Sequence, residues 1–413
     1  MTTRADATAD LLTPEAVRER CNMIFDLAVA GRTAHFDVDL TRLDTAATLV
    51  VSEMRRNYPD GDVPLHSRWR HFEFGGSDFW SQTLARHAPM ATDALARARI
   101  DLAVISVLLD AGAGSDWRFY DPTSGLIVGR SEGLALASLR MFEAGLLSND
   151  PARDPLRVDQ LALETLTTEA LARAFQVTPQ NALLGVDQRT SLLNNVGRTM
   201  GHASHVFARD DAVRPGHLFD YLKSRAGAAG VVPARLILIT LLQHLGAAWP
   251  GARRVGDTAI ADASDFPALK EVGADDGIVP FHKLSQWLSY SLIEPLQEAG
   301  IEVTDLDGLT GLAEYRNGGL LIDTGVLGFK DSEARQRRYG ASDELIVEWR
   351  ALTIALLDRV ADRVRSMTGT DATSLPLGAV LQGGTWSAGR RLAAELRTGG
   401  APPLTIATDG TLF

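Results

Sequence analysis

Apolar residues recur at helical spacing along most of the chain, separated by residues typical of helix ends. Thr13 precedes Pro14, the order expected at a helix start, and Gly31 follows the last apolar turn. The same pattern predicts further helices at 41–57, 91–111, 131–144, 158–175, 187–204, 217–225, 232–248, 280–299, 342–367 and 385–397. The sequence therefore predicts a mainly α-helical protein.

A few segments alternate in the manner of short strands. Residues 117–130 carry two aromatic or β-branched runs around an Asp-Pro-Thr-Ser-Gly turn, which predicts a β-hairpin. Residues 319–327 are typical of a short strand pair, and an Asp-Gly step in 404–413 indicates a further hairpin. Residues 58–76, rich in Pro, Gly, His and aromatics, read as a long loop of the kind that usually has a function.

The chain is 413 residues long, and one hydrophobic core usually organises no more than roughly 250–300 residues. We expect two α-rich lobes, 1–213 with the hairpin near 117–130, and 214–413 with most of the candidate site. No long low-complexity linker separates them, so we expect the lobes to depend on each other.

Composition and charge narrow the function classes. The chain is 45% hydrophobic and 23% charged, ordinary values for a soluble globular protein. Its 41 Lys and Arg against 52 Asp and Glu give a formal charge of −11, which argues against extended nucleic acid as a partner. This charge is compatible with a local pocket for a single phosphate.

Redox and membrane indicators favour the cytoplasm. The single cysteine, Cys21, cannot form an internal disulfide or a zinc site built from several cysteines. The first residues carry acids and lack an apolar signal core. The most apolar stretch, 231–249, contains Arg235 and His244, so it is better explained as a buried helix than as a membrane span.

Common cofactor and catalytic motifs are missing. The sequence has no GxGxxG after a strand, no Walker loop, no HExxH and no GxSxG, so no cofactor is predicted. His66 and His71 are five residues apart, and His202 and His205 are three apart on a predicted helix. No carboxylate accompanies the helical pair at ligand spacing, so we predict no metal site.

The first candidate cluster lies in the loop at 66–76. Arg68, Trp69 and Arg70 interleave guanidinium and aromatic groups, which bind anions and stack on flat groups. The alternative is that the aromatic rings enter the core while an arginine pairs with Glu73. The sequence favours neither interpretation.

The second cluster is Glu314, Tyr315 and Arg316, within 311–319. This stretch is typical of neither helix nor strand, and irregular backbone between structured elements often holds reacting groups. The alternative is a solvated turn whose Glu–Arg pair contributes under about 1 kcal/mol.

Two predicted helices carry the third cluster. Lys283, Gln286, Trp287 and Tyr290 share one face of the 280–299 helix, an unusual combination for a core stripe.

On the 342–367 helix, Glu348 and Arg350 lie among apolar residues. If Glu348 faces inward it needs a partner, because an isolated buried charge costs several kcal/mol. Arg316 or Lys283 could supply that partner, whereas an exposed Glu348 would need none.

The fourth cluster follows Gly383 and Gly384. Glycines ahead of a helix start leave free N–H groups at its positive end, where a phosphate can bind. Arg390 and Arg391, about one turn further on, would reinforce such a site. The alternative is simple helix capping by Thr385.

These segments also carry a family resemblance that covers nearly the whole chain. The sequence resembles the uracil catabolism protein 4 family of fungi and bacteria in the blocks HSRWRHFEFGG (66–76), RPGHLFDYL (214–222), VPFHKLSQWLSYSLIEPL (279–296), LTGLAEYRNGGLLIDTGVL (309–327), ELIVEWRALTIALLDRV (344–360) and LQGGTWSAGR (381–390). That family belongs to a route that converts uracil into a nucleotide and then opens its ring. The resemblance therefore implies a small nucleotide-derived substrate, either a ring-opened uridine nucleotide or a ribosylurea.

A second, more distant resemblance covers about 280–360. The order of an HKxxQ helix, an AEYR segment and a VEWR helix is similar to the queuosine-salvage nucleoside hydrolases, which resemble helical DNA glycosylases in fold. The resemblance implies a DNA-glycosylase-like helical core in the C-terminal half and cleavage of an N-glycosidic bond. The residues it marks are Lys283, Glu314, Tyr315, Arg316, Glu348 and Arg350. The relatives carry Asp where this chain has Glu314, which displaces the carboxylate.

We therefore hypothesise a cytoplasmic N-glycoside hydrolase in which Glu314 acts on the sugar or on a water. Tyr315 or Glu348 would donate the proton to the leaving nitrogen. The hypothesised substrate-binding residues are Lys283, Arg316, Arg350, Trp69, Arg68, Arg70, Trp287, Gly384, Thr385 and Arg390.

Two other functions are compatible with the sequence. One is a non-catalytic binding or scaffold protein of uracil degradation. The other is a metal-dependent amidohydrolase acting on the ring-opened base, which would need His66, His71, His202 or His205 as ligands. The sequence leaves the oligomeric state open.

Overall fold

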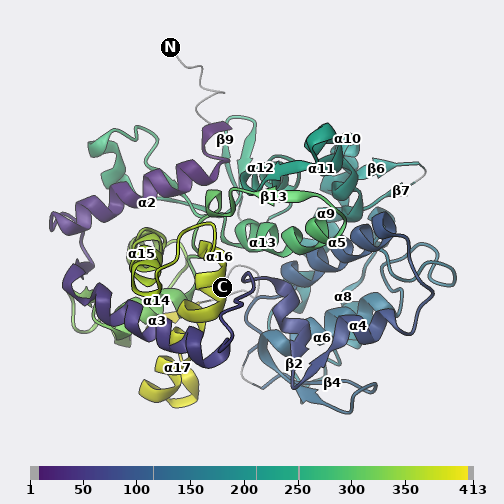
Figure 1. Ribbon diagram of the computed structural model, residues 1–413, viewed down its shortest axis with the longest axis horizontal. Coiled ribbons are helices and arrows are strands. Elements are labelled where there is room, and N and C mark those ends of the chain that lie inside the picture. The colour runs from purple at the N-terminus through teal and green to yellow at the C-terminus, as the bar shows by residue number, and fades with distance from the viewer. Residues whose placement is uncertain (1–8, 115, 211, 250–251, 408–413) are drawn as a thin grey trace. The chain divides into compact units, whose positions relative to one another are not determined.

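Helices dominate the computed structural model, which describes residues 9–114, 116–210, 212–249 and 252–407 (Figure 1). Every sheet within these residues has two short strands. The predicted mainly α-helical fold class is therefore confirmed. No helix of the described part of the chain is both long and apolar enough to cross a bilayer.

The chain divides into two compact units, each assembled from separate segments. Unit 1 contains the residues up to His66 together with Arg253–Gln286 and Asp305–Ala407, and unit 2 contains Ser67–Ala252 and Trp287–Thr304. The boundary expected at 213–214 falls inside unit 2.

Unit 1 is built around long helices. Its helices are α2 (Pro14–Val29), α3 (Leu43–Asn57), α14 (Tyr315–Asp323), α15 (Glu344–Thr368), α16 (Leu377–Val380), a π-helical segment (Leu381–Thr385) and α17 (Trp386–Leu396), with short 3-10 turns η1 (Leu40–Arg42), η6 (Pro267–Val272), η7 (Leu306–Gly308), η8 (Ala334–Gln336) and η10 (Thr398–Gly400). Its strands pair as β1 (Phe36–Val38) with β14 (Leu327–Phe329), β9 (Arg253–Val255) with β10 (Thr258–Ile260), β11 (Ala263–Asp265) with β12 (Ile278–Pro280), and β15 (Arg338–Tyr339) with β16 (Thr405–Ile406). The last pair is parallel and the others are antiparallel.

The core of unit 1 forms around α15. In Figure 1 this helix is seen nearly end-on between α2 and α3, both of which it contacts. Its residues from Leu345 to Leu357 are buried on all sides, including the ionisable residues Glu348 and Arg350. Thr13 caps α2, as the sequence predicts, and Gly369 ends α15 in the left-handed conformation at φ 72°.

Unit 2 contains the remaining helices. They are α4 (Phe79–Leu84), α5 (Thr92–Leu108), α6 (Arg130–Glu143), α7 (Gln160–Glu164), α8 (Thr168–Ala174), α9 (Val186–His202), α10 (Ser204–Phe207), α11 (Leu218–Ala226), α12 (Ala234–Leu245) and, from Trp287 onward, α13 (Lys283–Glu298), with 3-10 turns η2 (Arg68–Phe72), η3 (Pro215–His217), η4 (Gly227–Ala229) and η5 (Gly246–Ala248). The strand pairs are β2 (Glu73–Phe74) with β3 (Ser77–Asp78), β4 (Phe119–Tyr120) with β5 (Ile127–Val128), β6 (Ala208–Arg209) with β7 (Ala212–Val213), and β8 (Val231–Pro233) with β13 (Glu302–Thr304).

The central helix of unit 2 is α5. It is buried on every side from Ala98 to Leu108 and contacts α6, α9, α11 and η3. A helix that is apolar all round belongs in a protein core, and this one also buries a carboxylate, Asp101.

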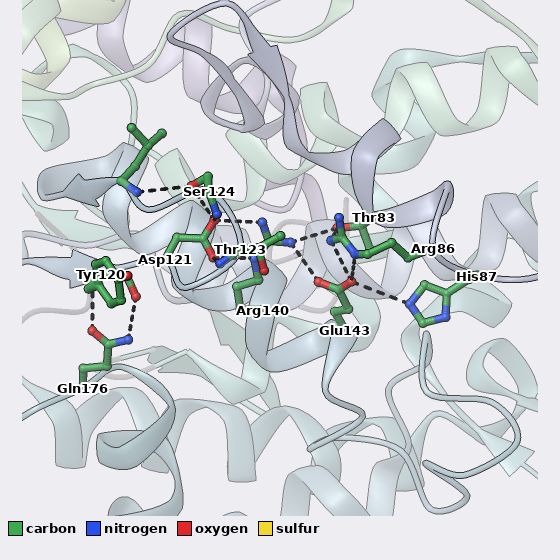
Figure 2. Close-up of polar contacts among 11 residues, drawn as sticks. Thr83, Arg86, His87, Tyr120, Asp121, Thr123, Ser124, Arg140, Glu143 and Gln176 are labelled. Carbon is green, nitrogen blue, oxygen red and sulfur yellow. Dashed lines mark hydrogen bonds and ion pairs between the residues drawn. The ribbon is translucent and has the colours of Figure 1, made fainter.

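The hairpin predicted over 117–130 is confirmed as β4 and β5. Figure 2 shows how its turn is fixed: Asp121 accepts hydrogen bonds from Ser124 and from Arg140 of α6, at 2.7 Å from Ser124 Oγ and 2.8 and 2.9 Å from the guanidinium. Arg140 also pairs with Glu143 at 2.8 Å. The turn is therefore attached to the helix that follows it.

Two expectations about local structure are wrong. Residues 319–327 do not form a strand pair, because a helix starts at Tyr315 and only β14 is extended. The helix expected over 158–175 is two short helices, α7 and α8, separated by the cap residue Thr167. The hairpin expected from the Asp-Gly step of 404–413 lies at residues outside the described part of the chain.

Candidate active site

Glu314 stands at the N-terminus of α14. Its two carboxylate oxygens accept the backbone N–H groups of Arg316 at 2.7 Å and of Asn317 at 2.5 Å, so the side chain caps the helix. Asp, Asn, Ser and Thr are the usual N-caps. A longer carboxylate in this role is therefore a local feature that sequence patterns did not reveal.

Close packing fixes the position of α14. A Cβ on Gly389 of α17 would lie 2.1 Å from the carbonyl oxygen of Arg316, and one on Gly318 would lie 2.7 Å from Thr353 Oγ1 of α15. Both contacts are shorter than any side chain tolerates. Glycines therefore let the start of α14 lie directly against α15 and α17, and so they hold Glu314 in place.

Burial and charge act on Glu314 in opposite directions. Burial raises the pKa of its carboxyl above the ordinary 4.5, while the two backbone hydrogen bonds and the charges of Lys283 and Arg316 lower it in part. Glu314, Tyr315, Arg316 and Lys283 each keep some solvent exposure. In unit 1, Lys283 and Arg316 thus lie close enough to Glu314 for their charges to act on its carboxyl.

Arg316 and Tyr315 interact with each other. The guanidinium carbon of Arg316 lies 4.8 Å from the centre of the Tyr315 ring, and Arg316 Nη1 donates to the Gly400 carbonyl at 2.9 Å. Arg316 is therefore held in a defined orientation while remaining partly exposed.

A buried ion pair between Asp262 and Arg350 holds the backbone of Lys283. Asp262 accepts a hydrogen bond from Arg350 at 2.8 Å and one from the Lys283 backbone N–H at 2.8 Å. Burial alone would raise the pKa of Asp262, but the charge of Arg350 and its hydrogen bond hold that pKa below 3.8. The Arg350 guanidinium also stacks on Phe281, 4.0 Å from the ring centre. Arg350, predicted as a substrate ligand, thus orients the start of α13.

Two residues next to these contacts, Asp262 itself and His282, which precedes Lys283, have a strained backbone. Asp262 and His282 both have φ of 50°, a region that non-glycine residues rarely adopt and that is enriched at functional sites. The ring nitrogens of His282 lie 2.6 Å from the Ala261 carbonyl and 2.8 Å from that of Leu11. Sequence reasoning missed Asp262 altogether, because no motif surrounds it.

Glu348 has a different partner from those expected. Its oxygens accept the backbone N–H groups of Phe36 at 2.9 Å and His35 at 3.2 Å, rather than facing Arg316 or Lys283. Burial raises its pKa above 4.5 in spite of these bonds and of one from Thr33. The carboxylate is buried, as one of the two interpretations required, and it anchors the segment before β1.

The glycines at 383 and 384 do not precede a helix start. The π-helical segment joins α16 to α17, so their amides lie inside one continuous helical stretch and offer no free helix N-terminus. A Cβ on Gly384 would lie 2.3 Å from Val50 of α3, which shows that close packing requires the glycine. Thr385 donates to Asn317 Oδ1 at 2.8 Å, and so ties this segment to α14.

Arg390 lies on α17 and is partly exposed. Its guanidinium carbon is 5.3 Å from the centre of the Trp386 ring.

The other predicted binding residues belong to unit 2. Arg68 is buried and pairs with Asp110 at 3.1 Å, and Trp69 donates to the Ser291 carbonyl at 2.8 Å. Arg70 pairs with Glu73 at 2.9 Å. These contacts match the alternative interpretation, in which the aromatic ring is buried and an arginine pairs with Glu73.

Trp287 is also buried, and its ring contacts His71 edge-on at 5.7 Å between ring centres and Arg68 at 5.6 Å.

The histidines proposed as metal ligands have other neighbours. His66 Nδ1 lies 2.8 Å from Gln382 Oε1 in unit 1. His205 contacts His244 edge-on in unit 2, at 4.8 Å between ring centres. Over the described ranges, no three His, Cys, Asp or Glu side chains form a group that could hold a metal ion.

Fold and site together define a mainly α-helical protein in which an anchored, largely buried carboxylate lies near a lysine and an arginine. The chain belongs to the family described as "Protein of unknown function (DUF1688)", whose model matches residues 10–413. It is 36% identical to Protein urg3 of Schizosaccharomyces pombe, over 99% of both chains. It is 34% identical to Uracil catabolism protein 4 of Lachancea kluyveri, over 96% of this chain and 97% of the relative.

Proposed function

We propose that this protein acts in uracil degradation and hydrolyses the N-glycosidic bond of a ring-opened uridine nucleotide or a ribosylurea. The products would be urea or a ureido compound and the free sugar or its phosphate. The name of the Lachancea kluyveri relative supports the pathway. The observation that carries the reaction type is the anchored carboxylate of Glu314, with its raised pKa, beside Lys283 and Arg316.

The chemistry explains why such a carboxylate is useful. Breaking an N-glycosidic bond passes through a sugar with oxocarbenium character, which an anionic group near the anomeric carbon stabilises. A carboxylate about 4 Å away contributes roughly 4 kcal/mol at an effective dielectric near 20. That corresponds to about three decades in rate.

Glu314 can cap α14 and still face a substrate. A carboxylate has about four lone-pair sites, and the two backbone N–H groups occupy one site on each oxygen. These bonds fix the orientation of the carboxylate before a substrate arrives, and preorganised charge costs no rearrangement during the reaction.

The neighbouring groups have distinct roles in this proposal. Tyr315 is the proton donor for the departing nitrogen in this proposal, since Glu348 is fully buried whereas Tyr315 keeps some solvent exposure. General-acid help of this kind typically contributes about 10²–10⁴-fold. Lys283 and Arg316 would bind polar or anionic parts of the substrate.

The direct test uses synthetic ribosylurea and its 5′-phosphate. Purified protein is incubated with each compound, and free urea and reducing sugar are measured over time. We expect release of both products in equal amounts from at least one compound. Absence of turnover with both would refute ribosylurea hydrolysis, the form of the reaction that this test addresses.

A non-catalytic binding protein is the second candidate. It is favoured by one observation, that the Glu314 oxygens already serve as a helix cap, which needs no substrate to explain it. Calorimetric titration with the same two compounds separates the candidates. Saturable binding without product release would favour the binding protein.

A further inference from the structure

Unit 2 contains a pocket that none of the roles described above uses. It measures about 470 Å³ and is lined by Arg97, Arg157, Arg209, Asp210, Ala212, Arg214 and His217. Four arginines thus line one pocket in a protein whose overall charge is −11. Asp210 contributes the opposing charge among these lining residues.

Carboxylates pair with these arginines and fix their orientation. Arg97 donates Nε and Nη2 to Asp220 at 2.8 and 2.6 Å, and Arg209 pairs with the same carboxylate at 3.2 Å. Arg214 pairs with Asp101, whose side chain is fully buried on α5. A guanidinium has five N–H donors, so each arginine is fixed on one edge and keeps donors for a ligand.

The RPGH segment at the start of the 214–222 block builds one wall of the pocket. Gly216 donates its N–H to Asp101 at 2.5 Å, and a Cβ there would lie 2.6 Å from the Arg97 carbonyl oxygen. The glycine therefore lets η3 approach α5 closely enough for Arg214 to reach Asp101. His217 Nδ1 donates to the Phe207 carbonyl at 2.9 Å, which fixes the ring at this wall.

A second pocket of about 340 Å³ continues from the first, because Arg157 and Ala212 line both. Its other walls include the amide side chains of Asn149 and Gln160, the carboxylates of Asp150 and Asp159, and the apolar side chains of Leu161 and Val213. Arg157 stands at the junction, held by Asp159 through a 3.0 Å bond from Nε. The paired pockets thus offer an anion site next to a site of mixed polarity.

We propose that this pair of pockets binds a small phosphorylated metabolite, with its phosphate on the arginines and its organic part toward Asn149 and Gln160. Fixed guanidinium groups bind phosphate through paired N–H donors, a geometry that lysine cannot supply. This site lies in unit 2 and is independent of the reaction proposed for Glu314 in unit 1.

The test measures binding to the full-length protein by calorimetry in low-salt buffer, using ribose 5-phosphate, ribose and inorganic phosphate as probes. The variant is Arg209→Ala, because the Arg209 side chain is 53% exposed and its loss leaves Asp220 paired with Arg97. The control is Arg153→Ala, an arginine of the same unit whose side chain is 88% exposed and which does not line either pocket. Arg209→Gln replaces the alanine variant if that variant does not fold.

We expect ribose 5-phosphate to bind, ribose not to bind, and Arg209→Ala to weaken binding about tenfold while Arg153→Ala matches the wild type. Inorganic phosphate binding as tightly as ribose 5-phosphate would identify free phosphate as the ligand of the same arginines. Ribose 5-phosphate is also a product of the proposed reaction in unit 1, so the comparison of Arg209→Ala with Arg153→Ala, both in unit 2, is what assigns the binding to these pockets. Equal affinities of Arg209→Ala and Arg153→Ala, or no binding of either phosphate probe, would overturn the proposal.

Discussion

At the scale of single residues, Glu314 has a structural role as a helix cap and a proposed chemical role in stabilising the sugar. Its carboxylate caps α14, and the same bonds orient it beside Lys283 and Arg316. Burial raises its pKa, and ionisation is required for it to stabilise a cationic sugar. The protonation state of Glu314 should therefore control the rate on the acid side.

We expect kcat/KM to fall as the pH is lowered through the pKa of Glu314, with an acid limb above pH 4.5. The fall should reach about tenfold per pH unit below that pKa. Replacing Lys283 with Met removes a charge that lowers the pKa of Glu314, so the limb should move to higher pH. Initial rates with the ribosylurea phosphate, measured from pH 4 to 8, provide the check, and a profile that is flat down to pH 4.5 would contradict this role.

The ion pair of Asp262 with Arg350 should matter mainly for stability. Both side chains are 5% exposed, so Asp262→Asn leaves a buried guanidinium without its counter-charge. We expect a loss of about 3–5 kcal/mol in the free energy of unfolding, measured by urea denaturation. Arg363→Ala breaks a pair whose side chains are 54% and 59% exposed and should cost under about 1 kcal/mol. Similar losses for the two variants would show that burial of the pair is unimportant.

Residue patterns in the sequence singled out Lys283, Glu314, Tyr315 and Arg316 as candidates, because unusual polar groups clustered in short segments. They could not identify Asp262, which follows a strand far from any of these and meets Arg350 only through the fold. They also suggested the wrong partners for Glu348, because the groups that donate hydrogen bonds to it are backbone amides. Backbone amides occur all along any chain, so the sequence does not indicate which of them a buried carboxylate will meet.

At the scale of elements, glycines determine how α14 fits its neighbours. Gly318 and Gly389 allow two helices to approach it, and Gly384 allows the π-helical segment to approach α3. The sequence indicated that the glycines at 383 and 384 were special, but their close packing partners are distant in the chain and could not be predicted.

Gly389→Ala should both destabilise the protein and reduce its activity. The new Cβ would meet the Arg316 carbonyl at 2.1 Å, which must displace the start of α14 and with it Glu314. We expect a loss of about 1–3 kcal/mol in stability, the range for overpacked sites. Gly328→Ala, whose Cβ would meet nothing within 4 Å, is the matched control. Thermal denaturation and product release are measured for both, and identical behaviour would contradict the packing argument.

The attachment of the β4–β5 hairpin should depend on pH. Although burial favours the protonated form, hydrogen bonds from Arg140 and Ser124 lower the pKa of Asp121 from 3.8 to about 2. The folded-state pKa is below the unfolded one, so this group stabilises the protein above pH 4 and its contribution is lost as the pH falls toward 2.

Asp121→Asn should therefore cost about 2 kcal/mol at pH 7, and its difference from the wild type should shrink between pH 4 and 2. Denaturation at several pH values measures this difference. Asp37→Asn, at a side chain that is 72% exposed, should have little effect at any pH. A difference that does not change with pH would show that the charge of Asp121 is not what holds the turn.

Helix positions were predictable where caps and apolar spacing agreed, as for α2 and α15. The β4–β5 hairpin was predictable from its turn residues and the aromatic or β-branched runs on either side. The error at 319–327 arose because Gly-Gly followed by apolar residues also suits a strand, and the cap that starts α14 is a glutamate, which is rare in that position.

At the scale of the whole molecule, each unit draws on distant parts of the chain. Sequence reasoning expects compact lobes to be continuous, since nothing local signals that residues 253–286 join residues before 67. The mainly helical class was predictable because it follows from local periodicity. The DNA-glycosylase-like arrangement of the C-terminal half stays a prediction.

The central claim is that the charge of Glu314 accelerates cleavage of an N-glycosidic bond. The most direct measurement is the single-turnover rate of urea release from ribosylurea 5′-phosphate by the wild type, Glu314→Gln and Glu314→Asp, each first shown to be folded by its thermal denaturation. We predict a loss of about a thousandfold for Glu314→Gln and a much smaller loss for Glu314→Asp, which keeps the charge. A folded Glu314→Gln variant that releases urea at the wild-type rate would contradict the claim.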